Sequence, residues 1–339
     1  LRRNIFPLKR AAILAPFSKL HNICRKFQKN NMSLLIVGTV AFDELITPFG
    51  ESGRIMGGSA TYAGLAASNF MNDIQLVSII GEDFPEEYMD RFHKRQIDTR
   101  GIRVVEGGKT FFWKGKYHND MNTRDSLDTQ LNVLAEFDPV LPEAYRNTEF
   151  LMLGNLTPAV QMKVLDQMET RPKLVVLDTM NFWMDNSWDE LMEVLKKVDV
   201  LTINDEEARQ LSGEYSLVKA AKKIATMGPK YLIIKKGEHG ALLFGEGEIF
   251  FAPALPLEEV FDPTGAGDTF AGGFIGFLAH SRDIDFENMK RAVIYGSALA
   301  SFCVEKFGVQ RINQITREEM HQRVQEFVSL TQFEVTLQD

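Results

Sequence analysis

Short apolar runs alternate with longer segments of helical spacing along the chain after Met32. The apolar runs are continuous and of strand length, and they lie at 34–40, 74–80, 150–153, 174–177, 200–203 and 231–234. Patterns with helical periodicity separate them, at 60–70, 84–95, 159–168, 188–198, 206–211 and 217–227. Strands that alternate with helices are typical of βαβ units. The pattern therefore predicts an α/β fold with a mostly parallel central sheet flanked by helices.

Two segments interrupt this alternation. Residues 109–117 (KTFFWKGKY) are aromatic without helical periodicity, and they follow the apolar run 102–105 across a Gly107-Gly108 turn. This arrangement predicts a β-hairpin, which could form a small separate sheet together with residues 44–48. The second interruption, 241–251, predicts two strands on either side of residues 245–247. From Gly267 onward the pattern predicts helices at 269–279, 286–304 and 317–330.

The composition is that of an ordinary globular protein, with 339 residues of which 45% are hydrophobic and 25% charged. It excludes an intrinsically disordered, collagen-like or disulfide-rich protein. Two cysteines, Cys24 and Cys303, are too few for a zinc ribbon and indicate a reducing compartment, with the cytoplasm as the expectation. No apolar run approaches the roughly 18 residues that span a bilayer, so no membrane association is expected.

Charge is distributed unevenly. Residues 1–31 hold eight Lys/Arg and no acidic residue, whereas the rest of the chain carries 30 Lys/Arg against 46 Asp/Glu, a net charge of −16. So acidic a body argues against nucleic acid as the main ligand. Segment 1–31 is expected to be disordered or not native. It could be an organelle transit peptide, a basic arm, or an appended segment before a natural start at Met32. The folded domain is predicted at 32–339.

The strongest chemical signal is the string DPTGAGDTFAGG at 262–273. Its glycines allow a tight turn, and a predicted helix begins at once. Free N–H groups of Gly265, Ala266 and Gly267 would therefore point outward at the positive end of a helix, which favours an anion. Asp268 lies at the same helix start. A carboxylate there can simply stabilise the helix, but beside an anion hole it is also well placed as a general base.

This string resembles the C-terminal motif of the ribokinase/PfkB family of carbohydrate and nucleoside kinases almost residue for residue. Three further motifs follow the family's order and spacing: Gly57-Gly58-Ser59-Ala60, Asn204-Asp205-Glu206-Glu207 and Lys236-Gly237-Glu238-His239-Gly240. The agreement extends from about residue 34 to residue 330. No Walker-type phosphate loop, nucleophile elbow or zinc-ligand spacing is present in the sequence to support another class of enzyme.

The resemblance implies a ribokinase-like fold in which a small β lid, here at about 43–50 and 102–118, covers the acceptor site. It assigns proton abstraction to Asp268 and charge stabilisation to the amides of Gly265, Ala266 and Gly267. It also implies an ATP and Mg²⁺ site, with Mg²⁺ held by Asn204 and Glu207, partly through water. The ATP contacts would be Asn204, Lys236, Gly237, Gly240 and Thr264, and the acceptor contacts Asp43, Gly57, Gly58, Ser59 and Tyr62.

Each assignment has a structural alternative. Asn204 and Glu207 could be a helix N-cap and an exposed first-turn carboxylate, Asp43 a turn residue, and Gly57-Gly58 a plain helix entry. Segment 178–183 (DTMNFW) could reach the phosphates or form a capped turn with core aromatics. Asp262 and Gly308 resemble parts of the family's monovalent-cation site, so K⁺ is a possible activator, and lids of this kind often pair subunits into homodimers.

Two departures leave the acceptor open. Tyr62 stands where many sugar kinases have Asn, which removes an amide and could provide a stacking face, and Lys235 stands where Thr is common beside the nucleotide. The sequence predicts an ATP-dependent sugar kinase acting on a primary hydroxyl. A nucleoside kinase is the first alternative, favoured by Tyr62 and the aromatic lid segment. A non-catalytic scaffold is the second, and the intact Gly265–Asp268 string argues against it. A screen of ATP consumption over sugars and nucleosides would separate them.

Overall fold

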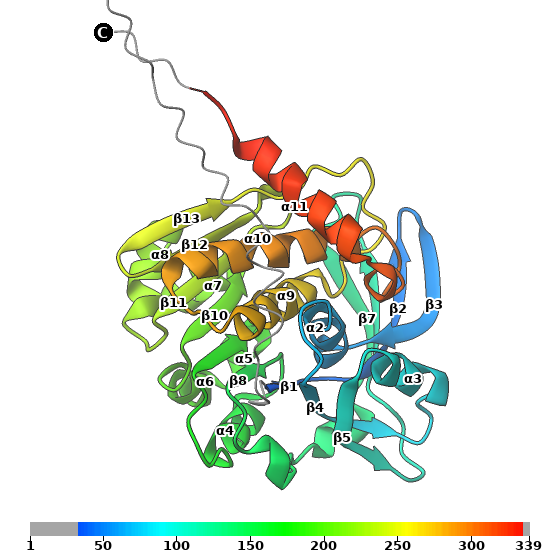
Figure 1. Ribbon diagram of the computed structural model, residues 1–339. Helices are drawn as coiled ribbons and strands as arrows, with labels where there is room; N and C mark the ends of the chain where they lie inside the picture. Colours follow the sequence, from blue (N-terminus) through cyan, green and yellow to red (C-terminus); the bar gives the residue numbers. More distant parts are fainter. Residues whose placement is uncertain (1–32, 335–339) are drawn as a thin grey trace, which may run out of the picture. The chain divides into compact units, whose positions relative to one another are not determined.

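The computed structural model describes residues 33–334, which form one large sheet, one small sheet and the helices around them (Figure 1). The large sheet has nine strands in these residues. Neighbouring strands pair in parallel, except that β12 and β13 join antiparallel at one edge. Their order is β13 (Glu248–Ala252), β12 (Ala241–Gly245), β11 (Tyr231–Lys235), β10 (Val200–Asn204), β9 (Leu174–Asp178), β8 (Phe150–Leu153), β1 (Leu34–Val37), β4 (Ile74–Gly81) and β5 (Ile97–Val105). The predicted α/β class with a mostly parallel sheet is confirmed.

Helices cover both faces of this sheet because its strands are apolar on both sides. Leu34 and Ile36 of β1 belong to one hydrophobic core, and Leu35 and Val37 belong to a second core on the opposite face. The first core is completed by α2 (Ser59–Ala67), α3 (Glu86–Lys94), α9 (Ala266–Ser281), α10 (Phe286–Cys303) and α11 (Arg317–Thr331). The second is completed by α4 (Pro158–Asp166), α5 (Asn181–Asn186), α6 (Trp188–Leu195), α7 (Asp205–Ser212) and α8 (Leu217–Ala225).

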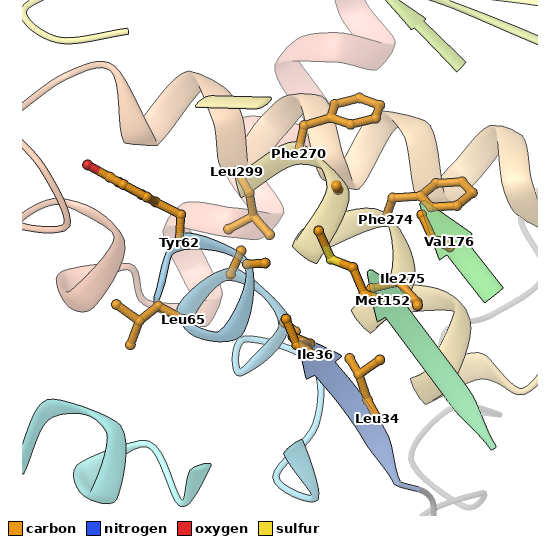
Figure 2. Close-up of a cluster of buried hydrophobic side chains, with 14 of the residues drawn as sticks. Leu34, Ile36, Tyr62, Leu65, Met152, Val176, Phe270, Phe274, Ile275 and Leu299 are labelled. Atoms are coloured by element: carbon orange, nitrogen blue, oxygen red, sulfur yellow. The ribbon is translucent and has the colours of Figure 1, made fainter. Parts of the chain in front are cut away.

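Helix α9 packs closely between α2 and α10, as Figures 1 and 2 show. A side chain at Gly272 would collide with the backbone of Ala63 in α2, and one at Gly276 would come within 2.7 Å of the Cα of Ala67. Phe274 and Ile275 of the same helix lie in the first core with strands β1, β8 and β9 (Figure 2). The absence of side chains at Gly272 and Gly276 therefore allows α9 to pack closely on α2, the helix that follows Gly57-Gly58.

The small sheet, referred to here as the lid, has four strands in the order β3 (Gly50–Gly57), β2 (Ala41–Thr47), β6 (Phe112–Tyr117) and β7 (Arg124–Gln130). Strand β2 pairs antiparallel with β3 and parallel with β6, and β6 pairs antiparallel with β7. The predicted hairpin of 102–105 with 109–117 was wrong. Residues 102–105 lie in β5 at the edge of the large sheet, where they pair in parallel with β4. The lid uses β3 and β7 instead.

The element boundaries otherwise follow the sequence pattern within a few residues. The run 34–40 is the exception, since β1 ends at Val37 and β2 already begins at Ala41. Short 3₁₀ turns complete the described chain at η1 (Asn132–Glu136), η2 (Glu143–Tyr145), η3 (Gly237–His239) and η4 (Ile312–Gln314). The predictions for segment 1–31 lie outside the described residues, and the cytoplasmic location stays a prediction. Within 33–334 no helix is long and apolar enough to cross a bilayer.

Candidate active site

Three neighbouring parallel strands of the large sheet end in polar residues at one edge. Asp178 is the last residue of β9, Asn204 of β10 and Lys235 of β11. Asn204 is the register partner of Lys235, and Asp178 is that of Thr202. All three share the α9 face of the sheet. Val176 and Ile233, two positions earlier in β9 and β11, lie in the core with α9, and Thr202, two positions before Asn204, is the register partner of Ile233. The carboxyl edge of a parallel sheet is where α/β folds bind ligands.

The N-terminus of α9 faces this row. Gly265 adopts a left-handed conformation with φ of 74°, which favours glycine, and it is the N-cap of α9. The N–H groups of Gly265 and Gly267 have no acceptor among the described residues, whereas Ala266 N–H donates to the Pro263 carbonyl at 3.2 Å and Asp268 N–H is engaged by its own carboxylate. The predicted anion hole of three free amides is therefore wrong at Ala266, whose amide is already engaged.

Asp262 braces the loop before this helix. One of its oxygens accepts from Thr264 N–H and the other from Gly308 N–H, both at 2.8 Å. Asp262 has no exposed surface, and burial raises its pKa to about 6 even though these two hydrogen bonds lower it. Asp262 and Gly308 thus meet, as the resemblance implies, but as a carboxylate and an amide donor joining two loops.

Asp268 is half-buried in the first turn of α9. Burial raises its pKa to about 7, and the nearby Asp178 carboxylate adds to the rise. Two positive charges oppose that shift, Lys235 from β11 and Arg124 from the lid. A general base works best when its pKa lies near the operating pH, so these surroundings suit the role expected of Asp268.

Lys235 lies beside the start of α9. Its Nζ lies 3.2 Å from Asp178 Oδ2 and 3.1 Å from the position that a Cβ on Gly267 would occupy. Burial alone would lower the pKa of Lys235, but the charges of Asp178, Glu207 and Asp268 raise it, so the ammonium stays charged. The sequence assigned the neighbouring Lys236 to the site. The alternation of side chains along β11 after the core residue Ile233 was the signal for Lys235.

Asn204 and Glu207 form a capping box at the start of α7. Asn204 Oδ1 accepts from Glu207 N–H, and Glu207 Oε2 accepts from Asn204 N–H, both at 2.8 Å. The N-cap alternative is therefore present, but Glu207 is buried rather than exposed, and burial raises its pKa to about 7. Its other oxygen, Oε1, has no partner among the described residues. The capping box therefore leaves Glu207 Oε1 available to a ligand. The positive charges of Lys235 and Arg124 act on this carboxylate.

The predicted nucleotide loop is a tight turn after β11. Lys236 N–H donates to the Gly240 carbonyl at 2.8 Å, and the 3₁₀ turn η3 lies between them. Gly237 has φ of 55°, and Gly240 has φ of 80° with the Ala252 carbonyl packed against its Cα. Only glycine fits both positions, so this loop presents backbone rather than side chains. Phe182 and Trp183, after β9, are not core aromatics: Phe182 is 52% exposed, and Trp183 is partly buried with its Nε1 bonded to Asn155 at 2.8 Å.

On the other side of Asp268, the lid contributes Asp43. This residue lies inside strand β2, not in a turn, and is buried; burial raises its pKa to about 8, with Asp262 and Asp268 adding repulsion. A side chain at Gly57, on the adjacent strand β3, would collide with the Asp43 carboxylate. Gly58, with φ of 97°, fits against the Thr39 carbonyl. The glycine pair therefore makes room for Asp43 as well as for the helix entry.

Ser59 and Tyr62 lie deeper than expected. Ser59 exchanges hydrogen bonds with Thr39, since its Oγ accepts from Thr39 N–H at 3.0 Å and its N–H donates to Thr39 Oγ1 at 2.9 Å. Tyr62 is 1% exposed, and its ring lies against Gly265, so the predicted stacking face for a base was wrong. Its hydroxyl has no partner among the described residues and points away from the core side chains in Figure 2. It lies in the electrostatic field of Asp43 and Asp262.

The turn between β6 and β7 reaches both halves of the site. Thr264 Oγ1 donates to the Tyr117 hydroxyl at 3.1 Å, which links the lid to the loop before α9. Asn122 Oδ1 lies 3.0 Å from where a Cβ on Gly237 would be, so the lid also touches the nucleotide loop. Arg124 is the register partner of Tyr117, and its positive charge lowers the pKa of Asp268 and of Glu207. The sequence pattern gave no indication of Arg124, because residues 124–130 have no apolar alternation that would predict a strand.

Comparison with known proteins agrees with this geometry. The model of the pfkB family of carbohydrate kinases matches residues 35–316, so the chain belongs to that family. It is 29% identical over 260 residues to a cytidine kinase of Thermococcus kodakarensis, covering 75% of this chain and 91% of that protein. It is 25% identical over 298 residues to a nucleoside kinase of Methanothermobacter thermautotrophicus, covering 82% and 91%. A ribokinase of Haemophilus influenzae is 24% identical over 299 residues, covering 82% and 94%.

Solved structures share the fold. A nucleoside kinase of Methanocaldococcus jannaschii superposes with a TM-score of 0.71 at 20% identity, covering 87% of this chain and 99% of that one. The Arabidopsis thaliana ribokinase complexed with ribose and ATP gives 0.68 at 19% identity, covering 86% and 98%. A Burkholderia thailandensis nucleoside kinase in complex with inosine gives 0.70 at 19%, covering 88% and 99%. The protein is a kinase that transfers a phosphoryl group to a hydroxyl acceptor, a sugar or a nucleoside.

Proposed function

We propose that the protein transfers the γ-phosphoryl group of ATP to a primary hydroxyl of a sugar, with Asp268 as the general base. The observation that carries this proposal is the convergence of the buried Asp43 and the half-buried Asp268, two carboxylates from opposite elements whose charges interact beside the free amides of Gly265 and Gly267. Asp43 holds vicinal hydroxyls of the acceptor, with Gly57, Gly58, Ser59 and Tyr62 around it, and Asp268 receives the proton.

The step balances as a single displacement. The acceptor oxygen forms a bond to Pγ, the bond from Pγ to the β,γ-bridging oxygen breaks, and ADP leaves with that oxygen. The hydroxyl proton moves to the Asp268 carboxylate. Charge that develops on the transferring group is stabilised by the N–H groups of Gly265 and Gly267 at the positive end of α9. ATP extends from there toward Asn204, Thr264 and the Lys236–Gly240 loop.

The donor set near Asn204 fits Mg²⁺ bound together with ATP. No group of three or more acidic, His or Cys side chains within 33–334 could hold a metal by itself. Mg²⁺ in kinases needs only one or two carboxylates, because phosphates and waters complete its shell, and the unpartnered Glu207 Oε1 is such a ligand. When bound, Mg²⁺ would neutralise phosphate charge. A Glu207→Gln variant should need more Mg²⁺ for half-maximal rate, and an unchanged Mg²⁺ titration would leave Glu207 as a helix cap only.

A nucleoside acceptor is the second candidate. The relationship to a cytidine kinase over 91% of that protein favours it, because the acceptor hydroxyl would again belong to a pentose. The deciding experiment is a coupled assay of ADP release with ribose, fructose, other sugars and the common nucleosides, using Asp268→Asn as the blank. A sugar with kcat/KM well above every nucleoside supports the first candidate, and the reverse order supports the second. No release with any acceptor contradicts both.

Two further ligands and partners belong to the proposal. A monovalent cation such as K⁺ would bind near Asp262 and Gly308, and replacing K⁺ by Na⁺ at constant ionic strength should then lower the rate. A homodimer would form through the lid, where strand β7 is an exposed edge along its whole length and Leu127 is 50% exposed. Light scattering should then give about twice the chain mass, and Leu127→Lys should lower it.

A further inference from the structure

Lys235 and Asp178 form a buried ion pair that the proposed function does not yet use. Lys235 Nζ lies 3.2 and 3.4 Å from the two oxygens of Asp178, whose side chain is 8% exposed, while that of Lys235 is 18% exposed. A buried ion pair is costly to desolvate and contributes little net stability on average. Its place at the catalytic edge of the sheet therefore calls for an account other than stability.

The ammonium group of Lys235 lies beside the proposed anion hole. Lys235 Nζ lies 3.1 Å from the position that a Cβ on Gly267 would occupy, so it stands over the Cα of the residue that donates one of the two free loop amides. Gly265 tolerates no side chain here, since its φ is 74° and the Tyr62 ring covers it, whereas at Gly267 the nearest atom to an added Cβ is Lys235 Nζ itself. With the Ala266 amide engaged by Pro263, the hole has two free loop amides rather than three, and Lys235 lies beside one of them, that of Gly267.

We propose that Lys235 is a catalytic residue that contacts the transferring phosphoryl group, and that Asp178 is the positioning residue that holds it there. This inference rests on the proposed function. The Lys235 ammonium keeps its protons and donates hydrogen bonds to the oxygens of the group as it leaves ADP and joins the acceptor oxygen. A charged donor in a partly buried site gains most when negative charge builds up, so its effect falls on the rate of transfer.

The ion pair with Asp178 explains how a flexible lysine side chain is held in position for this contact. A lysine side chain loses considerable rotamer entropy when it is held in one position, and a fixed carboxylate reduces that cost at the moment of reaction. Thr179 N–H donates to Asp178 Oδ1 at 3.0 Å, which fixes the carboxylate in turn. The charged groups that act on Asp268 are then Asp178, Lys235 and Arg124, and Lys235 also keeps the Asp268 pKa from rising further.

The test compares Lys235→Met and Lys235→Arg with the control Lys230→Met, at a surface lysine on the opposite end of strand β11. The Lys235→Met variant should lose about 10²-fold or more in kcat, as loss of one oxyanion-hole donor does. Lys235→Arg should recover part of the rate, and Lys230→Met should keep it all. Wild-type kcat for Lys235→Met would overturn the proposal, whereas an inactive wild type would instead refute the proposed function.

Nucleotide binding separates a contact with the γ-phosphoryl group from a structural role. Affinities for ADP and for a non-hydrolysable ATP analogue are measured by calorimetry on the same variants. Lys235→Met should weaken the analogue about tenfold or more and leave ADP within about twofold, because ADP lacks the group that Lys235 contacts. Equal weakening of both nucleotides would overturn the proposal. The pH–rate profile of Lys235→Met should also move its acidic limb to higher pH, because a positive charge beside Asp268 is gone.

The variant Lys235→Met leaves Asp178 without its partner and could unfold. The double variant Lys235→Met/Asp178→Asn removes both charges and should restore the melting temperature without restoring the rate or the preference for the ATP analogue. A double variant that regains wild-type kcat would show that the pair acts only through stability and would overturn the proposal. Asp178→Asn alone should lower kcat by less than Lys235→Met, since the amide oxygen still accepts from the ammonium.

Discussion

The large sheet and the lid approach the same site with very different surroundings. Strands β1, β8 and β9 are buried along their whole length, because helices cover both faces of the large sheet. In the lid, all residues of β7 and half of those of β3 are exposed. The large sheet thus holds Asp178, Asn204 and Lys235 on a rigid base, and α9 holds Asp268. The lid contributes Asp43, Tyr117 and Arg124 from a sheet with little core of its own.

This difference in packing suggests that the large sheet and the lid have separate roles in the reaction. Groups that must be placed accurately relative to the transferring phosphoryl group stand on elements packed on two sides, where small displacements are resisted. Asp43, which is proposed to bind the acceptor, lies on the lid, and the lid contacts the loop before α9 through the Thr264–Tyr117 hydrogen bond and the loop after β11 through Asn122. Substitutions of the first groups should therefore act on kcat, and substitutions in the lid on the KM of the acceptor.

The largest effect is expected at Asp268. The Asp268→Asn variant keeps the shape of the side chain and removes the proton acceptor, so kcat should fall at least about 10²-fold while ATP binding survives. Steady-state kinetics and ATP titration measure the two quantities. The wild-type rate should also rise with pH through about 7, where the base loses its proton. Near-wild-type turnover in Asp268→Asn would contradict the assignment.

The packing difference predicts a large contrast in stability. Ile36→Ala, in a strand with no exposed surface, should lower the free energy of unfolding by about 2–5 kcal/mol. Leu127→Ala, in lid strand β7, should change it by no more than about 0.5 kcal/mol. Urea unfolding of both variants checks this. Equal losses would show that the lid is as well packed as the large sheet.

Asp43 tests the role of the lid. Above pH 8, where Asp43 is ionised, loss of hydrogen bonds to a charged group costs about 1.5–3 kcal/mol, so Asp43→Ala assayed there should raise the KM of the acceptor roughly ten- to hundredfold. The KM of ATP should hardly change, because the nucleotide is assigned to the Asn204 and Gly237 side. If the KM of ATP rises instead, the two halves of the site have been exchanged in our assignment.

A smaller effect concerns pH and stability without ligands. Burial raises the pKa of Asp43 to about 8 and that of Asp268 to about 7, well above the value of about 3.9 in unfolded chains. The folded state therefore holds more protons than the unfolded state between about pH 4 and pH 8, so stability falls as pH rises through this range. Differential scanning calorimetry should show a melting temperature that decreases from pH 5 to pH 8. In Asp43→Asn the decrease should be smaller, and an unchanged slope would contradict the burial of a titrating Asp43.

The smallest effect is expected at the contact between the lid and the loop before α9. Tyr117→Phe removes the hydroxyl that accepts from Thr264 Oγ1. A neutral hydrogen bond is worth about 0.5–1.5 kcal/mol, so the KM of the acceptor should rise about two- to tenfold with little change in kcat. A fall in kcat without a change in KM would mean that this contact positions α9 rather than the lid.

The sequence by itself determined the fold class, the order of most helices and strands, and the glycine-rich turn before α9 on which the proposed base lies. These features are local: a strand or helix pattern, and a glycine turn followed by a helix, can be recognised from neighbouring residues. The glycines at 272 and 273 belong to the same string, although their reason is the close packing of α9 on α2 and α10.

Only the tertiary structure decided the rest. Residues 102–105 of β5 have the pattern of a hairpin strand, but β5 pairs with β4. Strand β7 pairs with β6 although its sequence has no apolar alternation. In both cases contacts between residues far apart in sequence determine the pairing. Tyr62 lies under Gly265, which no local pattern indicates. The choice between Lys235 and Lys236 depends on which face of β11 meets α9, since successive side chains of a strand point to opposite faces. One residue of register therefore separates Lys235, which lies beside Gly267 at the start of α9, from Lys236 in the turn after β11.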